Sequence, residues 1–285
     1  MPYSAQISRK NPTLFVFLID QSGSMDAEDS QGKKLSEHVS ETLNRLIAGL
    51  LLRCTKNEDV RDYFHLAVIG YSGSGVQHLI KPEGNNRTSV KISEIPKKLI
   101  RTEEKKRKVP DGAGGLVEIK FNYFVWIEPM ANGGTPMVGA FAKAKEIIAE
   151  FIQEYPNSYP PIILNLTDGE PSDWSGNGPI PEALDLMKSK TTDGDVLVLN
   201  CHMSVNEGYI HKFPDSPDKL DPKAKDLFYS SSILPEVFLS AARERDYKVS
   251  PNSRGYMYNA DITNIIQFLE IGTRVDQLAI TGPER

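Results

Sequence analysis

The side chains best suited to hold a cation follow directly after an apolar run near the start of the chain. Leu14 to Ile19 are all apolar, and Asp20, Ser22 and Ser24 come next at alternate positions. The apolar run predicts a buried strand, and a loop curling over its end can aim one carboxylate and two hydroxyls at a single point. Oxygen ligands with little charge suit Mg²⁺. These residues therefore predict a cation site at the end of the first strand.

Two later segments carry similar groups at similar places. Gly134 and Thr135 come just before an amphipathic pattern typical of a helix, and Asp168 ends a second apolar run over 162–167. In an open parallel sheet, ligands bind beyond the carboxyl ends of the strands, where the strand order reverses. Because Asp20 and Asp168 both end strands, we expect the three segments to meet at that edge.

Together the three segments resemble the metal-ion-dependent adhesion site of the von Willebrand factor A (vWA) domain family. In that family the aspartate and both serines of the first loop, the threonine of the second and the aspartate of the third hold the ion. The resemblance implies that Mg²⁺, or else Mn²⁺ or Ca²⁺, is held here by the matching residues, which are Asp20, Ser22, Ser24, Thr135 and Asp168. The residues expected to support these ligands or to face a partner are Gln21, Gly134, Glu170 and Asp173.

Strand and helix patterns alternate along the chain, which predicts an α/β fold with a doubly wound, mostly parallel sheet covered by helices on both faces. The vWA resemblance adds a Rossmann-like topology with one antiparallel edge strand and inserted loops or a hairpin. Strands are expected over 13–19, 64–71, 116–128, 162–167 and 195–203. Helices are expected over about 33–53, 135–151, 181–190, 235–246 and 261–272.

The chain length favours one domain over 1–285, with a core over about 12–275. The polar segment 81–115 predicts an inserted hairpin or loop beside an edge strand, and the glycines and prolines of 205–232 predict a loop-rich extension. Between residues 97 and 108 the insertion is rich in lysine and arginine. A solvated edge is favoured there over a nucleic-acid site, because Glu103 and Glu104 dilute the positive charge.

The overall composition favours partners that are selected by a site rather than by bulk charge. Lys and Arg number 33 against 38 Asp and Glu, for a net charge of -5, which argues against binding to nucleic acid or to a membrane surface. The start of the chain lacks the apolar core of a signal peptide, and no apolar run approaches the ~20 residues that span a bilayer. We therefore expect a cytoplasmic protein, with Cys54 and Cys201 as buried, reduced thiols.

The expected ligands favour binding over catalysis. In the family the first aspartate commonly holds the ion through a water, so the metal keeps excess positive charge and an exchangeable position. A carboxylate from a partner protein is the natural ligand for that position. Hydrolysis would also need a base beside the ion, and Glu170 and Asp173 lie near enough in sequence to be candidates, although support of the metal or of a partner surface is favoured for them. We therefore predict a protein-binding module and no enzyme.

The third loop, Thr167 to Pro171, resembles that of bacterial stand-alone family members linked with tellurite resistance and with stress or defence systems. This resemblance implies a kinase, a phosphatase or a chaperone as partner. Two alternatives stay open, namely an adaptor subunit of an AAA+ ATPase and a small Mg²⁺-dependent phosphohydrolase. A second cation at the acidic loop of Asp26, Glu28 and Asp29 is a further alternative to a solvated loop.

Overall fold

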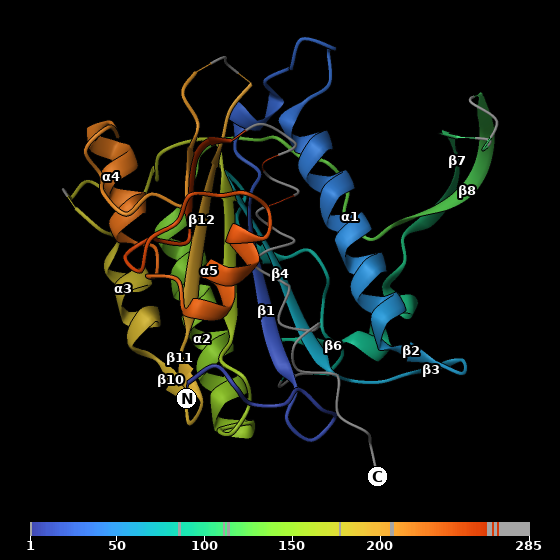
Figure 1. The fold of residues 1–285 in the computed structure, drawn as a ribbon, viewed down its shortest axis with the longest axis horizontal. Coiled ribbons are helices and arrows are strands. Elements are labelled where there is room, and N and C mark those ends of the chain that lie inside the picture. The colour runs from blue at the N-terminus through green and yellow to red at the C-terminus, as the bar shows by residue number, and fades with distance from the viewer. Residues whose placement is uncertain are drawn as a thin grey trace.

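A central sheet of eight strands runs through the described part of the chain (Figure 1). The computed structural model describes residues 2–260 except 85, 86, 111, 113, 114, 177, 206 and 207, together with Asn264 and Gln267. The strands of the sheet are β1 (Thr13–Asp20), β4 (Phe64–Ser72), β5 (Gly75–His78), β6 (Val90–Lys91), β9 (Ile162–Thr167), β12 (Leu197–Met203), β13 (His211–Lys212) and β14 (Tyr256–Ala260). Their order is β13-β14-β12-β9-β1-β4-β5, with β6 also paired to β4.

The five central strands are parallel, as the continuous apolar runs predict. β1 pairs with β4 on one side and with β9 on the other, so the strand order reverses between β1 and β9. Antiparallel strands stand at both edges rather than at one: β5 and β6 pair with β4, and β13 pairs with β14. The expectation of a single antiparallel edge strand was wrong, because strands of two to four residues carry too little pattern to be recognised.

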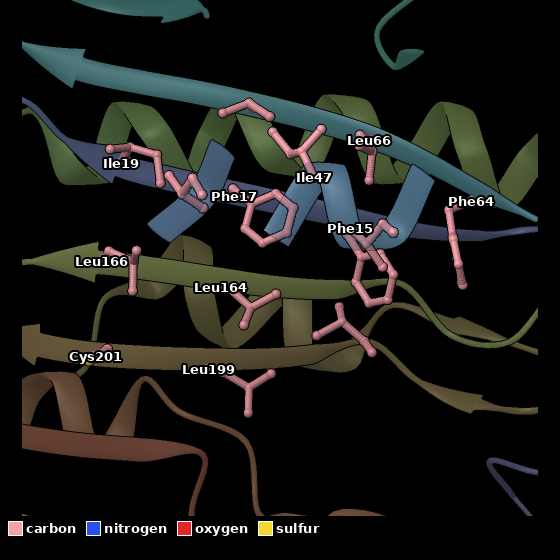
Figure 2. Packing of buried hydrophobic residues seen from close by; sticks show 14 of the residues in the cluster. Phe15, Phe17, Ile19, Ile47, Phe64, Leu66, Leu164, Leu166, Leu199 and Cys201 are labelled. Carbon is pink, nitrogen blue, oxygen red and sulfur yellow. The ribbon is translucent and has the colours of Figure 1, made fainter. Parts of the chain in front are cut away.

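Helices cover both faces of the sheet (Figure 1). They are α1 (Leu35–Cys54), α2 (Met137–Glu154), α3 (Pro181–Lys188), α4 (Pro222–Tyr229) and α5 (Glu236–Arg243). Every residue of β1 is buried, and its side chains alternate between the two faces. Phe15 and Phe17 pack with α1 residues such as Ile47, as Figure 2 shows, and Val16 packs with α2. Each buried phenylalanine contributes about 1.5–3 kcal/mol to the burial free energy.

The inserted hairpin reaches further along the chain than expected. β7 (Arg101–Pro110) and β8 (Leu116–Val125) pair with each other and form a sheet of their own, which projects beside α1 (Figure 1). The strand predicted over 116–128 is therefore β8. The start of the predicted insertion 81–115 was wrong, because Val90 and Lys91 pair with β4 and Ile92 and Ile95 are buried in the core. Most of β8 is exposed, because its apolar residues have no sheet to cover.

Ion pairs balance several basic residues of this hairpin. Lys105 Nζ lies 2.9 Å from Glu41 Oε1 of α1, which ties the hairpin to the body of the molecule. Lys106 Nζ lies 2.8 Å from Glu118 Oε1 on the opposite strand. Opposite charges that face each other across a hairpin stabilise it in water. These pairs fit the solvated edge predicted for residues 97–108.

The remaining elements are short. They are η1 (Gly23–Asp26), β2 (Thr55–Lys56), β3 (Asp59–Val60), η2 (Ile92–Lys98), β10 (Lys190–Thr191) and β11 (Gly194–Asp195). Helix α4 lies inside the segment 205–232 that was expected to be loop-rich. Of the helix predicted over 261–272, all but Asn264 and Gln267 lie outside the described residues. Cys54 and Cys201 are buried thiols and form no disulfide, as predicted. Within the described residues, no helix is both long and apolar enough to cross a membrane.

Candidate metal site

The end of β1 carries three of the five predicted ligands. Asp20 is 1% exposed, and its Oδ1 accepts a hydrogen bond of 2.8 Å from the backbone N–H of Ser22. The short helix η1 begins directly after Ser22 and turns the chain back, so that the Oγ atoms of Ser22 and Ser24 lie 3.0 Å apart. The loop therefore curls over the end of its own strand, as the alternation of these residues predicted.

The loop after β9 closes on the loop after β1. Ser24 Oγ donates to Asp168 Oδ1 at 2.8 Å, and Thr167 Oγ1 donates to Asp20 Oδ2 at 2.7 Å. Both contacts join residues more than 140 positions apart in sequence. They form because β1 and β9 are neighbours in register, with Ile19 opposite Leu166, so the two strands end level with each other. The two carboxylates meet where the strand order reverses, which is the position predicted for them.

Backbone hydrogen bonds hold the second loop against the first. Gly23 N donates to Gly133 O at 2.8 Å, and Asn132 N donates to Gln21 O at 2.7 Å. Thr135 follows two residues later and is 7% exposed. The structure thus links Asp20, Ser22, Ser24 and Asp168 by hydrogen bonds and places the fifth predicted ligand, Thr135, in the loop that packs against them.

Two glycines allow this close approach. Gly133 has a φ of +67°, a conformation that favours glycine, and a Cβ built on it would lie 2.6 Å from the Cα of Gly73. A Cβ on Gly73 would in turn lie 2.8 Å from the Cα of Gly133. Any side chain at either position would push the second loop away from the end of β4 and thereby away from the ligands of the first loop.

Ser172 and Asp173 hold Thr135 and the helix that follows it. Thr135 N donates to Ser172 Oγ at 2.9 Å, and Ser172 N donates to Thr135 O at 2.9 Å. The two carboxylate oxygens of Asp173 accept from Val138 N at 3.1 Å and from Gly139 N at 2.9 Å. A negative charge is stabilising at a helix N-terminus. Asp173 therefore supports the site, one of the two roles expected for it, by capping α2.

The other three predicted neighbours differ in exposure. Gln21 is 4% exposed, and its Oε1 is buried without a hydrogen-bond partner among the described residues. Of the two roles expected for Gln21, support of the ligands or contact with a partner, its buried position fits the first. Gly134 and Glu170 are exposed beside the ligands, where a partner can reach them.

The electrostatics of the site favour a bound cation. Burial raises the pKa of Asp20 to about 6, and the charge of Asp168 adds to the effect, against hydrogen bonds from Ser22 and Thr167 that lower it. Burial also raises the pKa of Asp168. Both shifts mean that the two carboxylates are poorly compensated when ionised, and a cation between them would supply the missing charge.

The chemistry of the donor set selects the kind of cation. Two carboxylates and three hydroxyls are hard oxygen ligands, which suit Mg²⁺ or Ca²⁺ rather than Zn²⁺. Across the described residues there is no group of three or more His, Cys, Asp or Glu placed to hold a metal, so hydroxyls are needed to complete a site. The residues at the ends of β1 and β9 therefore fit a divalent cation of the Mg²⁺ class.

The acidic loop after the first ligands has another role. Asp26 Oδ1 lies 2.6 Å from Lys34 Nζ, and Asp29 Oδ2 lies 2.7 Å from His38 Nε2 of α1. Asp29 Oδ1 also accepts from the backbone N–H of Lys33 at 3.0 Å. These contacts fold the loop onto the start of α1 and fit the solvated loop rather than a second cation.

Sequence reasoning did not single out several residues that shape the site. Thr167 orients Asp20, and Ser172 holds the backbone of Thr135. The sequence alone does not show in which direction such a hydroxyl group points. Asn165 does carry a signal, since it is polar within an apolar strand. It accepts a hydrogen bond of 2.8 Å from Tyr71 and donates one of 2.9 Å to Asn200, which forms a polar layer inside the sheet.

Comparison with known proteins gives matches among solved structures only. No family model matches the chain, and no relative is found among curated proteins. The pilus adhesin SpaC from Lactobacillus rhamnosus GG is similar at a TM-score of 0.50 and 11% identity, over 96% of this chain and 31% of that chain. The vWF domain of the type V pilus tip protein Mfa5 from Porphyromonas gingivalis is similar at a TM-score of 0.49 and 10% identity, over 97% of this chain and 99% of that chain.

A third similar structure is proximal thread matrix protein 1 from the mussel byssus, at a TM-score of 0.46 and 13% identity, over 94% of this chain and 47% of that chain. The chain thus spans about a third of SpaC and about half of the mussel protein. At 11% identity the likeness to SpaC shows the fold alone. The fold shared with SpaC has a mostly parallel sheet, helices on both faces and antiparallel edge strands.

Proposed function

We propose that this chain is a protein-binding module that takes hold of a partner's carboxylate through Mg²⁺, with Mn²⁺ or Ca²⁺ as substitutes. The ion would be held by Asp20, Ser22, Ser24, Thr135 and Asp168. The observation that carries this proposal is the 2.8 Å hydrogen bond between Ser24 and Asp168, which closes two distant loops around a cluster of oxygen atoms. A vWA-like fold, shared with a pilus adhesin, supports a role in protein interaction.

The charge of the site favours an acidic partner. Two carboxylates only neutralise a divalent ion and hydroxyls add no charge, so the ion can still accept a partner's carboxylate as a ligand, whereas a more acidic site would repel it. Ser24 is exposed and Asp168 is half-buried, so the cluster opens to solvent on one side. A partner side chain can therefore approach the ion without any rearrangement of the fold.

The proposal includes no catalysis. Both oxygens of Asp173, one of the two base candidates, already accept backbone hydrogen bonds at the start of α2 and are held there. The phosphohydrolase alternative requires turnover of a phosphate ester such as p-nitrophenyl phosphate. Turnover that disappears in an Asp20→Ala variant would favour that alternative over the binding module.

The cellular setting is proposed from the third loop alone. Thr167 to Pro171 resembles the loop of bacterial stress and defence members of the vWA family, so we propose a cytoplasmic partner of the kinase, phosphatase or AAA+ ATPase class. Within the described residues the absence of a membrane-spanning helix is compatible with this setting. Copurification with an AAA+ ATPase would select the adaptor alternative.

Affinity purification tests the metal bridge. Wild type and Asp168→Ala are used as bait with and without EDTA, and Asp185→Ala, which removes an exposed carboxylate on α3, is the matched control. We expect a partner that is recovered by wild type and by the control in Mg²⁺ and is lost with EDTA or with Asp168→Ala. If wild type and Asp168→Ala recover the same proteins, both with and without EDTA, the proposal is overturned.

A further inference from the structure

A cavity of about 440 Å³ opens next to the candidate metal site. Its wall begins at Gly169, the residue after Asp168, and continues along the same loop to Trp174. β12, β14 and α4 supply the other walls, with His202, Tyr258 and Leu227 among the lining residues. The volume is within the range of about 300–1,000 Å³ that ligand pockets occupy. A group bound in this cavity would therefore lie beside the metal.

The charged side chains that line the cavity are acidic. Glu170, Asp221 and Asp226 contribute three carboxylates, and among the described lining residues none is lysine or arginine. The one histidine, His202, accepts a hydrogen bond at Nδ1 from Asn259 N, and burial lowers its pKa, so it adds no positive charge near neutral pH. The cavity is therefore complementary to a cation.

Two of these carboxylates are held in fixed positions. Asp221 Oδ1 accepts from Ala224 N at 2.8 Å, and its Oδ2 accepts from Tyr258 Oη at 2.6 Å. Asp226 Oδ1 accepts from Gly178 N at 3.0 Å. Acceptors that are already oriented lose little entropy when a cation approaches, which favours binding. The negative walls are thus part of the folded structure.

The aromatic walls add a preference for a planar cation. The rings of His202 and Tyr258 are stacked, with centroids 4.9 Å apart and an interplanar angle of 22°. Trp174 lines the same cavity, and its Nε1 is buried without a hydrogen-bond partner among the described residues. A guanidinium stacks on aromatic faces and binds carboxylates with its fork of N–H groups. The indole N–H needs an acceptor, which a peptide carbonyl provides.

We propose that the cavity binds an arginine side chain of the same partner segment whose carboxylate binds the metal. This inference rests on the proposed function for the metal-bound carboxylate and extends it, because the partner is then recognised by an acidic and a basic residue close together. The metal selects the first and the cavity selects the second. A site that requires both a carboxylate and an arginine binds segments that carry only acidic residues more weakly.

The cavity is tested first without metal, so that this test is independent of the proposed function. In EDTA the protein is titrated with agmatine, which carries the guanidinium of arginine and an ammonium group, and with 4-aminobutylurea, which keeps the ammonium group and has an uncharged urea in place of the guanidinium. Trp174 fluorescence is the readout, and Trp174→Phe identifies its signal against that of buried Trp126. We expect a saturable change with agmatine and none with 4-aminobutylurea. No response to agmatine would overturn the proposal.

Variants locate the bound cation. Glu170→Gln and Asp226→Asn remove one charge each and keep an acceptor, so the cavity walls stay in place. We expect each to weaken agmatine binding at least fivefold. Glu118→Gln removes the same charge from the distant hairpin and should leave the binding unchanged. Equal weakening by Glu118→Gln would assign the effect to overall charge and overturn the proposal.

Peptides that carry both an aspartate and an arginine then test the metal site and the cavity together. Alanine-based peptides carry an aspartate and an arginine separated by one, two or three residues, and each has a counterpart with norleucine in place of arginine. In Mg²⁺ we expect at least one arginine peptide to bind tenfold more tightly than its counterpart, and Glu170→Gln to remove most of this gain. Equal binding of every pair would overturn the cavity proposal. If EDTA leaves all peptide binding unchanged, the proposed metal bridge fails, while the agmatine result still decides the cavity.

Discussion

Two neighbours hold the carboxylate of Asp20, and only one of them, Ser22, was predicted as a metal ligand. Asp20 Oδ1 accepts from the backbone of Ser22, and its Oδ2 accepts from the hydroxyl of Thr167. A buried carboxylate costs free energy unless it is hydrogen-bonded, and these two bonds also fix the direction of both oxygens. Thr167 thus orients Asp20 from the neighbouring strand.

Substitution of Thr167 by valine tests this orientation. The change keeps the shape of the side chain and removes the hydroxyl, so the affinity for Mg²⁺ should fall about 10- to 100-fold, as for other residues that orient metal ligands. Isothermal titration with MgCl₂ measures it. Thr13→Val is the matched control, because Thr13 is buried at the opposite end of β1 and donates to the Tyr159 carbonyl. Equal Mg²⁺ affinity in Thr167→Val and wild type would contradict the role of Thr167.

Gly133 permits a second prediction at the residue scale. Alanine at a positive φ costs about 1–2 kcal/mol wherever it stands. At Gly133 the new Cβ would also lie 2.6 Å from the Cα of Gly73, whereas at Gly75, with a φ of +94°, it would meet no atom within 4 Å. We expect Gly133→Ala to lower the free energy of unfolding in urea by about 1–3 kcal/mol more than Gly75→Ala, because overpacking adds to the backbone cost. Similar losses for both variants would show that the loops can separate freely.

At the scale of elements, the contact between β4 and α2 contains a buried titratable group. His65 is 4% exposed and lies edge-on to the rings of Phe151 and Tyr155. Burial lowers its pKa from 6.5 to about 4. As the pH falls from 6.5 towards 4, His65 becomes protonated in the unfolded chain but stays neutral in the folded protein. The stability that His65 contributes is therefore lost over this window, by about 3 kcal/mol in total.

A comparison of wild type with His65→Gln measures this loss. Urea unfolding between pH 7 and pH 4 should show a steeper fall in stability for wild type than for the variant. Asp20 and Asp168 contribute with the opposite sign, because their pKa values are raised in the folded state. Their contribution is common to both proteins and cancels in the difference. Identical pH profiles would show that the pKa of His65 is the same in the folded and the unfolded chain and would contradict the prediction.

The strands also show what a sequence can and cannot predict. β1 and β9 were predictable because an apolar run with no break requires burial on both faces. β8 has an equally clear alternation, but the pattern does not name the partner strand, and β8 pairs locally with β7. β14 was missed because it has only five residues, of which Tyr258 and Asn259 are polar and half-buried, so the apolar run is short.

In the candidate site, too, some features could be predicted from the sequence and others could not. Residue types and the ends of the strands were enough to predict that Asp20 and Asp168 meet. The direction of a side chain was not predictable, so the sequence left open whether Gln21 supports the ligands or faces a partner, and its side chain lies in the interior. Contacts between distant loops, such as Ser172 with Thr135, depend on how the loops pack and leave no periodic pattern in the sequence.

At the scale of the whole molecule, the fold places the candidate metal site and the acidic cavity at the same edge of the sheet. The reversal of strand order between β1 and β9 opens the crevice where the carboxylates meet, and the neighbouring strands β12 and β14 line the adjoining cavity. A partner that contacts both features binds the carboxyl ends of four strands at once. Because β1, β9 and β12 are almost entirely buried, the site is built on strands that the core holds from both faces.

Binding of Mg²⁺ should therefore stabilise the whole molecule. A ligand at 100 times its dissociation constant adds about 2.7 kcal/mol to the free energy of unfolding, which corresponds to a rise in Tm on the order of 5 °C for a domain of this size. Differential scanning calorimetry with MgCl₂ or EDTA measures this rise. Asp168→Asn should show no rise, and in EDTA it should unfold at the same or a higher temperature than wild type, because it removes one of two poorly compensated carboxylates. An equal rise in the variant would place the ion elsewhere.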